Sequence, residues 1–205
     1  MKHRLLLLGV SLLSTAILIA VGIGWLRGQT PRVSAVDPAV EGLPVPLNRM
    51  PSALSAYGAL QSWAVKWAED YKLVSANLEL QVGSGQVSGW SFILYSPKKG
   101  KLVSVLVAPA EIRVLREQSA LYPPRVVETS AWTYDAPSVL ASWWAARGKA
   151  HWQEMEADKL LLTLRQTKEG YGLWKLVCLN AEGEVLDAWY VRADNGEVID
   201  SPSAP

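Results

Sequence analysis

The sequence predicts an α+β protein in which an N-terminal transmembrane helix precedes two tandem units, each an α-helix packed on a 3-4-stranded antiparallel sheet. Three observations predict this fold class. Residues 5–26 are apolar and carry no charge. Apolar and polar residues then alternate from Val74 to Val82, the period of a half-exposed strand. Finally, a helix followed by strands occurs twice in the 205 residues, of which 50% are hydrophobic and can supply a core.

The apolar run at residues 5–26 is long enough to cross a membrane. Its 22 residues would span about 33 Å as a helix, against about 30 Å of hydrocarbon. Lys2 and Arg4 precede it, which favours a cytoplasmic start at residues 1–4. Val33-Ser34-Ala35 offers an alternative, the cleavage site of a signal peptide, but such peptides have apolar regions of about 7–15 residues. We therefore predict an uncleaved signal anchor in the cell membrane and an extracytoplasmic remainder.

A proline-rich linker is predicted at residues 27–51. It shows neither a helical nor a strand period, and prolines at this spacing favour a semi-extended chain. The linker would hold the folded part away from the membrane surface. Its prolines are Pro31, Pro38, Pro44, Pro46 and Pro51.

An internal repeat, displaced by 84 residues, divides the rest of the chain. Residues 90–95 resemble residues 174–179, and Val107 then falls on Val191. The repeat predicts a first unit at 52–118, a connector at 119–134 and a second unit at 135–201. Because units of this size are marginally stable alone, we expect them to pack on one another or to share a continuous sheet.

Each unit begins with a helical pattern. Ser52 is the predicted N-cap of the first helix, whose apolar residues recur at three- and four-residue steps as far as Tyr71. Asp135 or Ser138 would cap the second helix, and Gly148 weakens the middle of that helix.

Strands separated by turn residues follow each helix. The predicted turns lie at residues 83–85, 97–100, 181–183 and 194–196. The last of these, Asp194-Asn195-Gly196, resembles half of a calcium loop but lacks its acidic ligands, so we interpret it as a type I′ turn.

Composition and motifs argue against several classes of function. A net charge of +1 argues against a nucleic-acid partner. His151 is expected to be a half-buried or surface histidine of the second helix, and Cys178 falls on an alternating strand as a buried thiol, so a Cys–His protease is disfavoured. Carboxylates such as Glu154 and Glu156 cluster at a helix end, where they are usually solvated. We expect no catalytic residue, no cofactor and no metal site.

Ten tryptophans against one phenylalanine indicate two possible uses of Trp. Trp90, Trp174 and Trp189 are expected to fill the core, although exposed Trp could instead stack on glycan rings. Trp143 and Trp144 cannot both face inward, because neighbours on a helix point about 100° apart. The candidate partner-binding residues are Trp143, Trp144 and Trp152.

The order of parts resembles the TseB-like cell-wall elongation regulators, with tandem cystatin-like, PepSY-related domains behind one membrane anchor. The runs from Trp90 to Val107 and from Trp174 to Val191 carry the resemblance, and residues 190–199 are similar to the PepSY closing pattern. It implies no catalytic residues. The first unit departs from the pattern, because Ala108-Pro109-Ala110-Glu111 stands in place of the Asp-Asn-Gly ending.

These expectations combine into a non-enzymatic membrane protein that binds and regulates another membrane or envelope protein. The resemblance implies a cell-wall synthase as that partner. Pairing at a sheet edge, or an exposed Trp of a helix, would be the physical means of binding. The alternatives are a PepSY-type inhibitor or chaperone of a peptidase, and a glycan-binding wall module.

Overall fold

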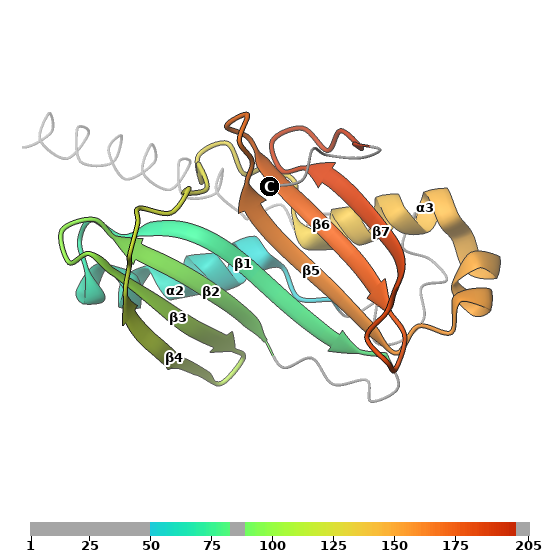
Figure 1. Ribbon diagram of the computed structural model, residues 1–205, viewed down its shortest axis with the longest axis horizontal. Helices are drawn as coiled ribbons and strands as arrows, with labels where there is room; N and C mark the ends of the chain where they lie inside the picture. The colour runs from blue at the N-terminus through green and yellow to red at the C-terminus, as the bar shows by residue number, and fades with distance from the viewer. Residues whose placement is uncertain (1–49, 83–88, 200–205) are drawn as a thin grey trace, which may run out of the picture. The chain divides into compact units, whose positions relative to one another are not determined.

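The computed structural model describes residues 50–82 and 89–199, which form one seven-stranded antiparallel sheet with two helices on one face (Figure 1). The strand order is β4-β3-β2-β1-β5-β6-β7. The α+β class is therefore confirmed. In chain order the elements are α2 (Ala53–Trp67), β1 (Lys72–Gln81), β2 (Trp90–Ser96), β3 (Lys101–Ala108), β4 (Glu111–Ser119), α3 (Ala136–Met155), β5 (Lys159–Gln166), β6 (Gly172–Leu179) and β7 (Val185–Arg192).

Several predicted features lie outside the described residues. They are the cytoplasmic start at 1–4, the membrane span at 5–26, the linker up to residue 49, the turn at 83–85 and the chain after residue 199. Neither helix within residues 50–82 and 89–199 has the combination of length and apolar character that crossing a membrane requires.

The helix α2 begins where the sequence predicts. The Ser52 side chain accepts a hydrogen bond from the backbone N–H of Ser55 at 2.9 Å, which satisfies one of the free donors of the first turn. Tyr57, Leu60 and Ala64 are buried against the sheet. The helix ends at Trp67, before Tyr71, because Ala68 takes an extended conformation.

A β-bulge changes which residues of β1 face the core. Ala76, Leu78 and Leu80 are buried, as the alternation predicts. The register with β2 shifts between Leu73 and Ser75, so Leu73 takes the buried position that strict alternation would give to Val74.

The sheet is continuous because β1 pairs with β5. This antiparallel pairing runs from Ser75 opposite Arg165 to Gln81 opposite Lys159. At its centre Leu78 lies opposite Leu162, the residue 84 positions later in the chain. The segments on either side of the predicted connector therefore share one sheet, as expected for units too small to be stable alone.

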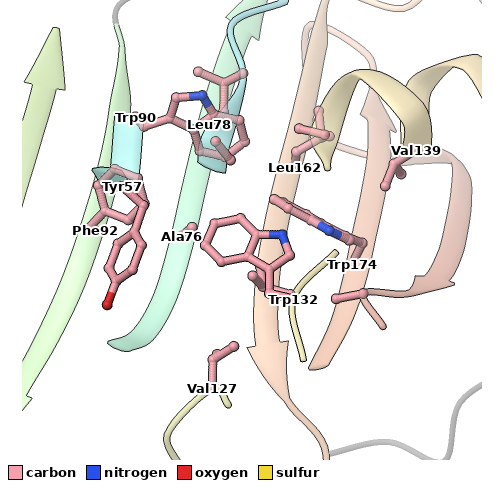
Figure 2. Packing of buried hydrophobic residues seen from close by; sticks show 14 of the residues in the cluster. Tyr57, Ala76, Leu78, Trp90, Phe92, Val127, Trp132, Val139, Leu162 and Trp174 are labelled. Atoms are coloured by element: carbon pink, nitrogen blue, oxygen red, sulfur yellow. The ribbon is translucent and has the colours of Figure 1, made fainter. Parts of the chain in front are cut away.

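Aromatic side chains fill the core on the face that the helices cover (Figure 2). Trp90 and Trp174 are fully buried, as predicted, and their rings meet edge to face at 5.8 Å between centroids. Trp132 packs against Trp174 on one side and Tyr57 on the other. Trp189 is only half-buried, and its indole donates to the hydroxyl of Ser142.

The N-termini of both helices meet at one carboxylate. Asp135 Oδ1 accepts from Ala136 N of α3 at 2.8 Å, so Asp135 is the N-cap, and also from Ala53 N and Leu54 N of α2 at 3.1 and 3.3 Å. A negative charge is favourable at a helix N-terminus, and here it is shared between two helices.

Helix α3 is kinked at Gly148, the residue expected to weaken its middle, which has φ 75° and ψ 178°. One detail of the second half differs from expectation. The turn after β7 is not type I′, which needs positive φ at both central residues. Only Gly196 there has positive φ, at 77°, and the Tyr134 ring lies where a Cβ would stand.

Candidate protein-binding site

The predicted partner-binding tryptophans lie together on α3, with different exposure. Trp143 is fully buried, whereas Trp144 and Trp152 are half-buried against it. The ring centroids of Trp144 and Trp152 lie 6.3 and 5.8 Å from that of Trp143. One of the adjacent pair thus faces inward and the other outward, as helix geometry requires. Only Trp144 and Trp152 keep surface that a partner could touch.

A carboxylate of β7 anchors this cluster. Asp187 Oδ2 accepts from Trp143 Nε1 at 2.9 Å and Arg147 Nε at 3.2 Å, and lies 3.3 Å from His151 Nε2. Its Oδ1 accepts from the backbone N–H of Ala188 at 2.9 Å. Arg147 precedes the kink of α3 and His151 follows it, so one carboxylate holds both parts of the helix to the sheet.

The electrostatics of this cluster stabilise the negative charge of Asp187 but do not activate Cys178 as a nucleophile. Burial alone would raise the pKa of Asp187, yet the hydrogen bond from Trp143 and the positive charge of Arg147 outweigh it and hold the pKa below its usual range. Cys178 is opposite Asp187 on β6, and burial together with that negative charge raises the pKa of its thiol to about 12. The thiol is therefore protonated at neutral pH, and His151 is engaged by Asp187 instead.

The other potential metal ligands among the described residues do not gather into a site. Glu154 and Glu156 are exposed at the end of α3, as expected for helix-terminal carboxylates. Within residues 50–82 and 89–199, no group of three or more His, Cys, Asp or Glu side chains is placed to hold a metal ion.

A cleft of about 500 Å³ lies beside the connector and the C-terminal end of β7. Arg192, a cation in its lining, donates from Nε and Nη2 to the carboxylate of Asp194, at 3.0 and 2.6 Å, and lies over the Tyr171 ring. Because the Arg192 guanidinium already pairs with Asp194 and stacks on Tyr171, it does not make this cleft a subsite for an anion.

The most exposed element is the edge strand β4. All nine of its residues are exposed, including Ile112 at 37%, Val114 at 47% and Leu115 at 50%. Helix α2 packs on β2 and β3 and reaches β4 through the hydrogen bond from Trp67 Nε1 to Glu117 at 3.1 Å. The sheet thus extends one strand beyond the helix that covers it.

The opposite edge of the sheet is partly protected. The chain returns after the turn and forms an antiparallel bridge between Val198 and Val191 of β7. Ile199 N donates to Tyr190 O at 3.0 Å, and Arg192 N donates to Glu197 O at 2.8 Å. Within the described residues β4 has no such cover, because it ends the strand order.

Comparison with known proteins finds nothing similar: no family model, no curated protein and no solved structure matches the chain. The candidate site therefore depends on geometry alone. The sequence predicted pairing at a sheet edge as one means of binding, but the residues it indicated lie on α3 and none lies on β4. The available signal was the alternation Glu111-Ile112-Arg113-Val114, which Leu115 interrupts.

Proposed function

We propose that the protein is a non-enzymatic, single-pass membrane protein that binds and regulates an envelope protein, with a cell-wall synthase as the first candidate. In this proposal residues 5–26 anchor it and residues 27–49 act as a spacer, because Met50 and Pro51 already contact the folded part. An extracytoplasmic module of two tandem cystatin-like, PepSY-related units binds the partner.

Equivalent contacts in the two halves support the tandem arrangement. Trp90 Nε1 donates to Pro51 O at 3.0 Å, and Trp174 Nε1 donates to Tyr134 O at 2.7 Å. Each acceptor is the residue immediately before the N-cap of a helix. The hairpins agree as well, since Trp90 pairs with Val107 as Trp174 pairs with Val191.

The open edge of β4 is the observation that carries the binding function. Among the described residues, β4 is a nine-residue edge strand, and such an edge presents backbone donors and acceptors that invite pairing with another chain unless they are protected. Addition of a partner's strand to such an edge is a general mode of protein recognition. Exposed Ile112 and Val114 would add apolar contact on the helix side.

Photocrosslinking from the two edges would test this function. A benzoylphenylalanine at Leu115 on β4 is matched by one at Val185 on β7, because both side chains are at least half exposed. In membranes of the native host, we expect the full-length chain with the probe at Leu115 to crosslink a wall synthase and the Val185 control not to. Equal crosslinking from both positions, or none, would contradict the assignment.

The same experiment separates the alternatives. A peptidase crosslinked from Leu115 would favour the inhibitor or chaperone function, and peptidoglycan fragments would favour a wall-binding module. Deletion of residues 1–30 tests the anchor: the truncated protein should leave the membrane fraction, and its retention there would contradict the proposed span.

A further inference from the structure

We propose that β4 binds an extended strand in which apolar and acidic side chains alternate. This inference rests on the proposed function, because it specifies the chemistry of the segment that the partner would present. The two faces of β4 carry different side chains. One face favours the apolar residues of the added strand, and the other favours its acidic residues.

A β-bulge at Leu115 determines which side chains of β4 lie on each face of the sheet. Arg116 lies opposite Ser104, but Val114 lies opposite the next residue, Val105, so Leu115 has no cross-strand partner. Without the bulge, Arg113 and Arg116 would point to opposite faces. With it, both lie on the open face of the sheet, away from the helices.

The helix side of β4 is apolar. Ile112 and Val114 lie opposite Val107 and Val105, which are buried residues of the core face. The one charged group on this side of the strand is Glu117, and Lys101 Nζ neutralises it at 2.6 Å. A strand added to β4 would therefore place apolar side chains here.

The open face of β4 is basic. Arg113 approaches Glu111 only at 3.9 Å, with both side chains more than half exposed, and such contacts contribute little. Arg116 makes no ion pair with any of the described residues. Two guanidinium groups are thus available along one side of the edge, where carboxylates of an added strand would lie directly opposite.

The same charges disfavour a second copy of this chain as the occupant. In an antiparallel pairing of two β4 strands about a two-fold axis, side chains that face each other must share a face of the sheet. The two registers with the greatest overlap would set Arg113 against Arg116, or Arg116 against itself, which is repulsive. A partner with acidic residues avoids this conflict.

A pair of synthetic strands would test the inference. The acidic probe is acetyl-Val-Glu-Val-Glu-Val-Glu-Val-amide, N-methylated along one edge to prevent self-association, and the control replaces each Glu by Lys. Fluorescence anisotropy of labelled peptide would be measured with the full-length protein in detergent. Two exposed ion pairs predict about tenfold tighter binding of the acidic strand, and the preference should weaken as salt is added.

Variants of β4 make the test specific. Arg113→Glu with Arg116→Glu should reverse the preference, whereas Arg165→Glu, an exposed cation on β5, should leave it unchanged. Val114→Lys should weaken both peptides. Equal affinity for the two peptides, binding of neither, or an acidic preference that survives the double reversal would overturn the inference.

The outcome can be separated from that of the proposed function. If neither peptide binds but Leu115 still crosslinks an envelope protein, the strand chemistry is wrong and the function stands. If the acidic peptide binds but no envelope protein is captured, the surface is correct and the function is wrong.

Discussion

The two halves of the sheet differ in what lies beneath their helices. Under α2, in the half that contains β1–β4, one layer of the core is apolar and fully buried; it consists of Leu60, Ala64, Leu94 and Val103. Under α3, in the half that contains β5–β7, the corresponding layer contains a hydrogen-bonded network of Trp143, Arg147 and Asp187, with Cys178 as the cross-strand neighbour of Asp187.

The correspondence is positional. Leu60 and Trp143 occupy the same position counted from the N-caps Ser52 and Asp135. Leu94 pairs with Val103 on β2 and β3, as Cys178 pairs with Asp187 on β6 and β7. The same architecture thus accepts an apolar layer or a buried carboxylate, provided that the carboxylate is fully hydrogen-bonded. It also follows that the network holds α3 in place, while the exposed edge strand β4 belongs to the apolar half.

Placing the carboxylate in the apolar half should have the largest effect. Val103→Asp puts a charge where Leu60, Leu94 and Ala64 offer no donor, so we expect a loss of about 4 kcal/mol or more in the free energy of unfolding. Urea denaturation followed by Trp fluorescence would measure it. Ser104→Asp, the next residue on the open face, is the control and should change stability little. A stable Val103→Asp protein would show that the two layers are interchangeable.

The reverse substitution should cost less. Asp187→Val has a suitable size but leaves Trp143 Nε1 buried without an acceptor, and we expect a loss of about 3 kcal/mol. Arg147 loses less, because its side chain is 41% exposed. The second part of α3, from His151 onward, should also gain faster amide exchange. Unchanged stability would mean that the network contributes no more than the apolar layer does.

The sequence predicted the parts of this comparison that depend on local periodicity. The cap Ser52, the buried Trp90 and Trp174, and the buried thiol of Cys178 follow from spacing and from the repeat. For the second helix the sequence offered Asp135 or Ser138, and the structure selects Asp135. The Asp187 network does not, because its donors come from an element 40 residues away in the chain, for example Arg147. The exposed edge was missed for a different reason. Whether β4 ends the sheet, and how far α2 extends over it, are decided by tertiary packing.

The two tryptophan anchors should be equivalent. Trp90→Phe and Trp174→Phe each remove the indole donor to the carbonyl before a helix and leave a smaller ring, at a cost of about 2 kcal/mol each. Thermal unfolding of both variants by circular dichroism would measure this. A cost confined to one of them would break the equivalence on which the tandem assignment depends.

The smallest effect concerns pH and separates the charge of Asp187 from its shape. Because the pKa of Asp187 is lower in the folded state than the ordinary value of about 3.9, its charge stabilises the fold above that value, and the contribution is lost as the pH falls through the folded pKa. Asp187→Asn keeps the size but cannot titrate. Between pH 6 and pH 3, the wild-type protein should therefore lose more stability than this variant.

Asp70, Glu117, Glu128 and Asp194 also have a lowered pKa, but they titrate in both proteins and cancel in the difference. Parallel stability curves would mean that Asp187 contributes hydrogen bonds alone, and the contrast between the halves would then concern polarity rather than charge.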